Sequence, residues 1–210
     1  MIEHLQRSRF TARTHHLASL ASDEATLRGM GVDDPTAMIE FVKAARRGDD
    51  PNGYLDRPFQ SKPQFPYQTR FSDGIASVFY SAIELETSKA EVAYHAPVRI
   101  LSAGHPVFYR EVQANFTGET KDLRGELATL PYLIANREDG GYDQCNKIAS
   151  EARTEGLDAL LTPSARRAGA DCLPVFVRVT LSNPVAGQWL MFSLDAATGA
   201  VQVTEADPIP

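Results

Sequence analysis

An arginine, a tyrosine and a glutamate, Arg70, Tyr80 and Glu91, follow one another at intervals of ten and eleven residues. The glutamate lies among small side chains in a segment of helix-forming residues, where a core helix would normally place leucine or isoleucine. A carboxylate with free space beside it can hold a ligand. The trio is therefore a candidate binding or catalytic site.

Each candidate also has an ordinary structural interpretation. A glutamate on a helix is usually a solvated surface residue, and Arg70 lies in the turn-like sequence TRFSDG. His95, four residues after Glu91, can orient the carboxylate, bond a ligand or simply pack at the end of its helix. Arg166 and Arg167 can attract phosphate or form a solvated charge pair.

The segments around the trio predict the elements that hold it. Residues 75–81 are apolar and aromatic, which predicts a short buried strand. Residues 84–95 are helix formers, and Pro97 is expected to end that helix. Residues 105–116 alternate well enough to predict a further strand.

The clearest helix covers residues 141–156. Its apolar residues recur at spacings of three and four, Asp143 can cap its start, and Gly156 closes it. Strands are predicted for three further stretches, the last a hairpin around Ala-Thr-Gly: 157–162, 173–180 and 188–205. Strands outnumber helices and do not alternate regularly with them, so the predicted fold class is α+β.

The first quarter of the chain differs from the rest. Residues 33–48 read as a helix with a proline in its first turn, and the proline- and glycine-rich residues 46–67 predict a long loop. The sequence predicts two parts, an N-terminal helical extension over residues 1–53, packed on the core, and a domain over residues 54–210.

Charge and cysteine content exclude several classes of protein. The 210 residues carry 21 basic and 27 acidic side chains, a net charge of −6, so the chain repels polyanions and nucleic-acid binding is not expected. Two cysteines without a CxxC pair suit a reducing cytoplasm. No apolar stretch approaches the roughly 18 residues needed to cross a bilayer, and no metal-ligand motif such as HExxH occurs. We expect a soluble, cytoplasmic protein without a catalytic metal.

Two sequence blocks resemble the RES-domain family, whose name stands for an arginine, a glutamate and a serine. They are TRFSDGIASVFYSAIELETSKAEVAYH and YDQCNKIASEARTEGLDALLTPSARRAGADCLPVFV, and the resemblance covers roughly residues 54–179. Arg70 matches the arginine of the family's GRF or SRF block, and Tyr80 its strand-end tyrosine. Glu91 matches the helix glutamate, and Ser164, in TPSAR, the serine.

Many members of that family carry another arginine in their first strand. Arg57 is the nearest candidate here, with Arg9 and Arg13 behind it. A loop salt bridge is the alternative role for Arg57.

The resemblance implies a fold and an activity. Members have an ADP-ribosyltransferase-like fold with a mixed or antiparallel β core, and they break the bond between nicotinamide and ribose in NAD by phosphorolysis or hydrolysis. NAD is then the substrate, inorganic phosphate a co-substrate in the phosphorolytic case, and no metal is needed. Some members instead ADP-ribosylate a protein.

The same resemblance assigns roles to the candidate residues. Glu91 would stabilise the positive charge that develops on the ribose and hold a hydroxyl. Arg70 would clamp the pyrophosphate. Tyr80 would stack on the nicotinamide or bond a ribose hydroxyl, and Ser164 would hold the nicotinamide amide or an incoming phosphate. Arg57 and His95 are the remaining substrate-binding candidates.

Two other functions stay open at this point. A mono-ADP-ribosyltransferase acting on one protein would use the same residues, and a RES-like fold without turnover would survive as an antitoxin-binding module. Because an enzyme that drains NAD must be restrained, we also expect a neutralising partner, such as the Xre-type antitoxins paired with this family. Homodimerisation is common in such proteins, and the sequence neither requires nor excludes it.

Overall fold

The computed structural model describes residues 2–19, 50–60, 68–104 and 106–206. Seven strands form one mixed sheet in the order β1-β2-β5-β4-β3-β6-β7. Their bounds are β1 Arg7–Ser19, β2 Phe79–Ala82, β3 Val107–Asp122, β4 Ala159–Pro163, β5 Asp171–Val175, β6 Leu181–Leu194 and β7 Val201–Glu205. The described helices are α3 Pro51–Asp56, α4 Leu85–Ala103 and α5 Gly141–Thr154. The α+β prediction is confirmed.

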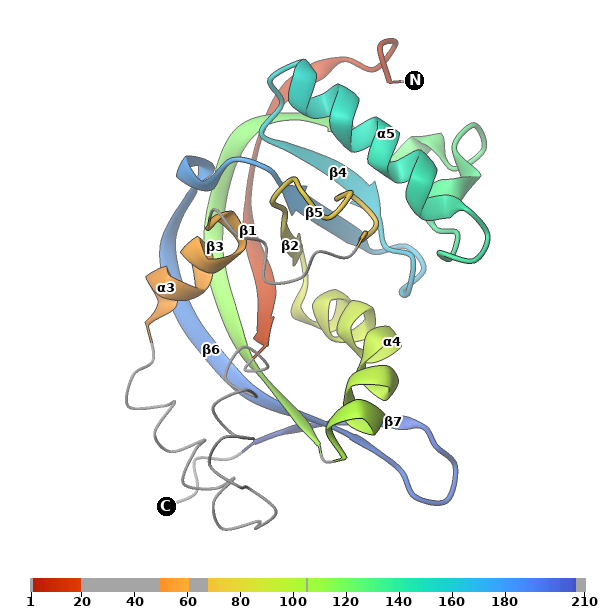
Figure 1. Cartoon of the computed structure of the whole chain (residues 1–210). Coiled ribbons are helices and arrows are strands. Elements are labelled where there is room, and N and C mark those ends of the chain that lie inside the picture. The colour runs from red at the N-terminus through yellow and green to blue at the C-terminus, as the bar shows by residue number, and fades with distance from the viewer. Residues whose placement is uncertain (1, 20–49, 61–67, 105, 207–210) are drawn as a thin grey trace.

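The sheet closes on itself through its first strand. β1 pairs with β2 and also runs antiparallel to β3 from Arg7 to Ser19, so that β1, β2, β5, β4 and β3 form a ring of pairings. Among the described strands, only β3 and β4 pair in parallel. Figure 1 shows β3 and β6 curving together along one side, with α4 and α5 on the other side of the molecule. The polar side chains of α4 and of the β4–β5 connection can therefore meet beside this ring.

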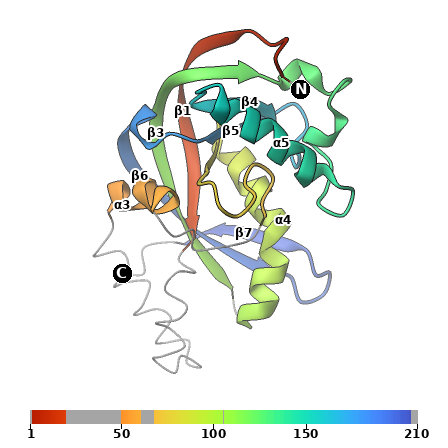
Figure 2. The same ribbon diagram turned by 45° about the horizontal axis from the view of Figure 1, so that its top comes forward.

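Three apolar clusters hold the elements together. One packs α5 against β4, a second fills the sheet between β2, β3 and β5, and the third packs α4 onto β3, β6 and β7. The turned view in Figure 2 shows α4 and α5 as separate elements. Each helix is thus fixed by its own buried face, and α4 presents its remaining side chains to the site described below.

The helix α5 forms as its spacing predicts. Cys145, Ile148, Ala149 and Ala152 are all fully buried, and the glycine after the helix, Gly156, has the positive φ that such an end requires. The predicted cap is wrong, because Gly140 occupies the N-cap. The Asp143 carboxylate instead accepts a hydrogen bond from Gln68 Nε2 at 2.6 Å.

The helix α4 runs past the predicted end. Pro97 lies inside it, and the helix ends only at Gly104, whose φ is +75° and whose N–H bonds to Ile100 O. Proline removes one backbone hydrogen bond, but Ala96 and Ile100 on either side of it are buried against the sheet. Packing therefore outweighs the local cost of the proline.

Several other predictions need correction. Within the predicted N-terminal helical extension, residues 7–19 are a strand of the central sheet. The predicted loop contains a short helix, α3, whose N-cap Asp50 accepts a bond from Asn52 N at 3.0 Å. The strand expected over 75–81 is displaced to β2, and Ile75 is 81% exposed. The helix predicted over residues 33–48 lies outside the described residues.

The remaining strand predictions are confirmed, with shifted ends. β3 contains most of the predicted residues 105–116 and continues to Asp122, and β4 falls within one or two residues of its prediction. Only the first part of 173–180 belongs to β5, because a 3₁₀ turn follows at Arg178–Thr180. The hairpin is β6–β7, closed by a bond from Gly199 N to Asp195 O.

Candidate active site

The centre of the site is the carboxylate of Glu91. The helix α4 carries Glu91, and the loop that leaves β4 carries Ser164 and Ala165. Glu91 Oε1 accepts a 2.6 Å bond from Ser164 Oγ and a 3.0 Å bond from Ala165 N. Two residues that the sequence predicts, 73 positions apart, are thus in direct contact.

Ser164 also shapes its own loop. Its Oγ accepts bonds from Arg166 N and Arg167 N at 3.1 and 3.0 Å, and its N–H bonds to Ala170 O at 2.7 Å. Ser164 is buried. One hydroxyl therefore fixes the turn of the loop and holds the carboxylate at the same time.

Cys172 adds a third contact to the carboxylate. It lies on β5, and its Sγ is 3.7 Å from Glu91 Oε1. Burial, reinforced by the negative charge of Glu91, raises the pKa of Cys172 well above its usual range. The side chain is therefore a neutral thiol that donates to Glu91, a role that the sequence does not reveal.

The second oxygen of Glu91 is not used in the same way. Among the described residues, none donates a hydrogen bond to Glu91 Oε2, and Glu91 is only half-buried. The carboxylate is thus held by one oxygen and open at the other. A ligand hydroxyl or a developing positive charge can be placed there.

His95 lies on the same helix, one turn after Glu91. Partial enclosure of its ring, and then the positive charge of Arg166, lowers its pKa although the residue as a whole is exposed, while the charge of Glu91 opposes this change. Its ring contacts Tyr94 edge to face, with 4.9 Å between the centroids. The imidazole is therefore mainly neutral at pH 7, within the electrostatic reach of both groups.

Arg70 is held by backbone oxygens rather than by a carboxylate. Its Nη1 donates to Leu133 O and Ala135 O, both at 2.9 Å, and its guanidinium lies over the Tyr142 ring at 5.0 Å. The charge of Arg70 acts on both Cys172 and His95. Arg70 therefore belongs to the same neighbourhood as Glu91, with one nitrogen already committed to the fold.

Tyr80 has a structural role at its hydroxyl. Its oxygen accepts a 2.9 Å bond from Phe71 N and lies 2.5 Å from Thr69 Oγ1. Enclosure of this hydroxyl raises the pKa of Tyr80 to about 12, although the residue as a whole is 37% exposed. The tyrosine thus pins the segment around Arg70 to β2.

Replacing Tyr80 by phenylalanine tests this role. We expect the free energy of unfolding to fall by about 1–3 kcal/mol, because Phe71 N–H loses its acceptor. Urea unfolding measures the change. Tyr94→Phe, which removes an exposed hydroxyl, is the matched control and is expected to cost less than about 0.5 kcal/mol. Equal costs for the two variants would contradict the structural role of the Tyr80 hydroxyl.

The contacts that fix Arg57 belong to β1 and α3. Its Nη1 donates to Ser19 O at 3.1 Å, and its guanidinium lies over the Tyr54 ring at 5.4 Å. The charge of Arg57 acts on His16, whose Nδ1 is 2.6 Å from Tyr80 O. These contacts of Arg57 place it beside β1 and α3, and none of them joins it to Glu91 or Ser164.

Arg166 and Arg167, whose roles the sequence left open, are not a solvated pair. Arg167 Nη1 donates to Glu84 Oε2 and, at 3.0 Å, to Thr87 Oγ1. Arg166 Nη1 donates to Asn136 Oδ1 at 2.7 Å, and its Cζ lies 3.3 Å from the centroid of the Tyr94 ring. Asn136 gives no sequence signal, since it lies in an irregular segment between the two blocks.

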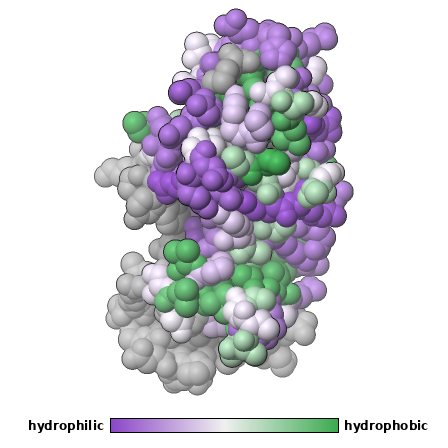
Figure 3. Space-filling view, turned by 90° about the vertical axis from the view of Figure 1, so that its right-hand side faces the viewer, coloured by the Kyte–Doolittle hydropathy of each residue, from purple (hydrophilic) through white to green (hydrophobic). Residues whose placement is uncertain are grey.

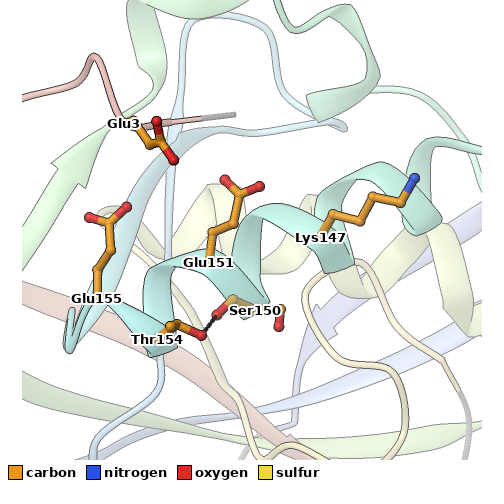
Figure 4. A pocket seen from close by; sticks show the side chains of 6 residues that line it. All are labelled: Glu3, Lys147, Ser150, Glu151, Thr154 and Glu155. Carbon is orange, nitrogen blue, oxygen red and sulfur yellow. Dashed lines mark hydrogen bonds between the residues drawn. The ribbon is translucent and has the colours of Figure 1, made fainter.

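A surface hollow of about 390 Å³ lies away from this site, along α5. Figure 4 shows the residues that line it, Glu3, Lys147, Ser150, Glu151, Thr154 and Glu155. Two of its acidic groups have structural partners: Glu151 Oε2 accepts a bond from Ile2 N, and Glu155 pairs with the buried Lys121 at 2.5 Å. The hollow is therefore explained by the packing of the N-terminal segment.

The described residues do not meet the requirements of a three-residue metal site or of a membrane-spanning helix. Within the part of the chain that the structure describes, no group of three His, Cys, Asp or Glu side chains is placed to hold a metal ion. None of the described helices is both long enough and apolar enough to span a bilayer.

Comparison with known proteins gives one family. The RES domain model matches residues 42–195, which includes all four residues of the predicted motif. Among solved structures, the chain is similar to the crystal structure of the M. tuberculosis MbcT-MbcA toxin-antitoxin complex, at 13% identity over 86% of each chain and a TM-score of 0.47. A search of curated proteins found no match.

Proposed function

This chain belongs to the RES-domain family, and we propose that it is a toxin-type enzyme that cleaves the bond between nicotinamide and ribose in NAD. The observation that carries the proposal is the carboxylate of Glu91, held through Oε1 by Ser164 and Ala165 and open at Oε2. A fixed negative charge with one free oxygen is what a cationic sugar intermediate requires.

The proposed reaction uses few protein groups. The bond between ribose C1′ and the nicotinamide nitrogen breaks, and nicotinamide leaves as a neutral base with the bonding electron pair. The positive charge left on the ribose is stabilised by Glu91. Water or inorganic phosphate then forms a bond to C1′ and releases a proton to solvent, which gives ADP-ribose or its phosphorylated form.

Other residues have supporting roles in this proposal. Ser164 holds the Glu91 carboxylate, and Tyr80 holds the segment that carries Arg70. Arg70 and Arg57 would provide positive charge toward the phosphates of the dinucleotide, and His95, whose pKa is lowered by its surroundings, would bond a substrate hydroxyl. The protein would act in the cytoplasm, where NAD is available.

The product distinguishes the proposed reaction from its alternatives. We expect purified protein incubated with NAD to release nicotinamide together with ADP-ribose, or with phosphorylated ADP-ribose when phosphate is present. Chromatography with mass detection identifies both products. Nicotinamide release coupled to a mass gain on a protein would instead indicate an ADP-ribosyltransferase, and unchanged NAD would indicate a binding module.

Replacing Ser164 by alanine tests how the carboxylate is held. The variant loses the hydrogen bond to the charged carboxylate and the two bonds that Ser164 Oγ accepts within its loop. We expect nicotinamide release to slow roughly 10- to 100-fold. Ser150→Ala on α5, which removes a surface hydroxyl, is the control and should release nicotinamide at the wild-type rate. If both variants keep the wild-type rate, Ser164 does not support Glu91 in turnover.

We also propose a protein partner that restrains this activity, in the manner of an Xre-type antitoxin. We expect such a partner because an enzyme that drains NAD would be toxic to the cell that makes it. Expression of the wild-type chain alone in a bacterial host should stop growth, and expression of Glu91→Gln should not. Normal growth with active wild-type protein would remove the reason for a partner.

A further inference from the structure

Arg166 carries a buried guanidinium edge with no partner. Its Nη1 is bonded to Asn136 Oδ1, but Nε and Nη2 are buried and have no hydrogen-bond partner among the described residues. A native structure rarely leaves buried donors unpaired, and an unpaired charged donor is especially unfavourable. This edge therefore calls for a hydrogen-bond acceptor that the described residues do not supply.

The geometry of the free edge indicates the kind of ligand. Nε–H and Nη2–H point the same way from a planar guanidinium, and this fork matches two oxygens of one phosphate or carboxylate. The Tyr94 ring covers one face of the guanidinium at 3.3 Å. Tyr94 is itself 41% exposed, so the guanidinium lies beneath a side chain at the protein surface.

The neighbouring arginine provides an internal comparison. Arg167 carries the same charge one residue later, but its guanidinium is paired with Glu84 and with Thr87. Arg166 is paired with a neutral amide and a neutral ring. Arg167 therefore has a carboxylate partner, whereas no carboxylate among the described residues pairs with Arg166.

The free fork lies beside the carboxylate of the site. Ala165 N bonds to Glu91 Oε1, and Arg166 follows Ala165 directly. Tyr94, on which Arg166 rests, lies three residues after Glu91 on the same face of α4. The charges of Glu91 and Arg166 both act on His95, so the two groups share one region.

We propose that Arg166 binds a phosphate group through Nε and Nη2, next to the bond that Glu91 helps to break. This inference rests on the proposed function, because it assumes that a phosphate-containing ligand enters this site. Two sources offer the same chemistry, the pyrophosphate of the dinucleotide and inorganic phosphate as the attacking group. Asn136 and Tyr94 are positioning residues, because they hold the guanidinium with its fork free.

The test measures binding directly, by calorimetric titration of ADP-ribose and, separately, of inorganic phosphate. Arg166→Gln is expected to weaken one of the two probes roughly 10- to 100-fold. Arg166→Lys keeps the charge but lacks the fork, so it should lose most of the same affinity. Arg167→Gln removes one positive charge from the same loop and is expected to bind both probes as the wild type does.

The probe that is affected identifies the source of the phosphate. Weaker ADP-ribose binding assigns Arg166 to the dinucleotide and predicts a higher KM for NAD, whereas weaker phosphate binding assigns it to the attacking group. Thermal unfolding of each variant shows whether it is folded, and if Arg166→Gln is not, Arg166→Lys alone decides. Equal binding by the Arg166 and Arg167 variants, or binding of neither probe by the wild type, overturns the proposal.

The results of these binding experiments can be distinguished from the results that test the NAD reaction. A wild-type protein that releases nicotinamide, with an Arg166→Gln variant that binds both probes normally, would refute the role of Arg166 alone. If the wild-type protein releases no nicotinamide but binds phosphate, and Arg166→Gln binds phosphate more weakly, the NAD reaction would be refuted and the phosphate site would be supported.

Discussion

Replacing Glu91 by glutamine is expected to slow nicotinamide release by roughly a hundred- to a thousandfold. Glutamine has the same shape, and its side-chain oxygen can still accept bonds from Ser164 Oγ and Ala165 N, the two donors that hold the carboxylate. Only the negative charge is lost. Removing one preorganised electrostatic contact of this kind typically costs about 3–4 kcal/mol in the barrier.

The measurement is the rate of nicotinamide release at saturating NAD, with thermal unfolding as a check on folding. Glu86→Gln is the matched control, since Glu86 lies in the first turn of the same helix, is exposed, and pairs only with Lys89 among the described residues. The control should keep the wild-type rate. A Glu91→Gln rate within threefold of wild type would show that the charge of Glu91 is not used in catalysis.

The second large effect concerns stability in acid and arises at Glu111. This carboxylate is 2% exposed, with Oε1 accepting from His15 Nδ1 at 2.7 Å and Gln113 Nε2 at 2.9 Å, and Oε2 from Gln188 N at 3.0 Å. Burial alone would raise its pKa, but these bonds and the nearby His15 lower it to about 2. A carboxyl pKa that is depressed on folding stabilises the native state at higher pH.

The lowered pKa of Glu111 determines the pH range over which this carboxylate stabilises the fold. The stabilisation by Glu111 is fully present above its ordinary pKa of 4.5 and is lost as the pH falls to about 2. The difference between these two pKa values corresponds to a free energy of unfolding on the order of 3 kcal/mol. Urea unfolding of wild type and Glu111→Gln across this range should give a difference in free energy that is largest above pH 4.5 and shrinks toward pH 2.

Other carboxyl groups titrate in the same range, including Asp73 and Asp122, whose pKa values are also lowered. Subtracting the variant from the wild type removes their contribution, because both proteins carry them. A difference that stays constant from pH 6 to pH 2 would mean that Glu111 does not hold its low pKa.

The parts of the fold that the sequence predicts well are those where local spacing and burial agree. In α5, the residues at spacings of three and four are the buried ones. β1 was missed because the side that carries Phe10 also carries Ala12 and Thr14, so its apolar alternation is weak, and because its partner β3 lies about 100 residues away. The register of a strand with weak alternation is decided by its partner.

The residues of the site also differ in how well the sequence predicts them. Glu91 and Ser164 are recognisable by type and order, and the structure brings them into contact. The backbone N–H of Ala165 has no sequence signature, because every residue except proline carries one. The partners of Arg166, Tyr94 and Asn136, come from a helix and an irregular segment. Contacts of this kind follow from tertiary packing and are not visible in sequence order.

Exposed apolar side chains on α4 lie close to this site. Tyr94, Val98 and Leu101 are 41%, 74% and 73% exposed and recur at spacings of four and three. Figure 3 shows apolar side chains gathered in the lower part of the face that looks toward the reader. The ring that covers Arg166 therefore begins an apolar stripe along the helix.

The central claim is that this protein turns over NAD at Glu91. The most direct measurement is the amount of nicotinamide released per protein molecule when the purified chain is incubated with excess NAD. We expect release far above one nicotinamide per protein, rising linearly with time, and a rate roughly a hundred to a thousand times lower from Glu91→Gln. Intact NAD with the folded wild-type protein, with and without added phosphate, would contradict this claim.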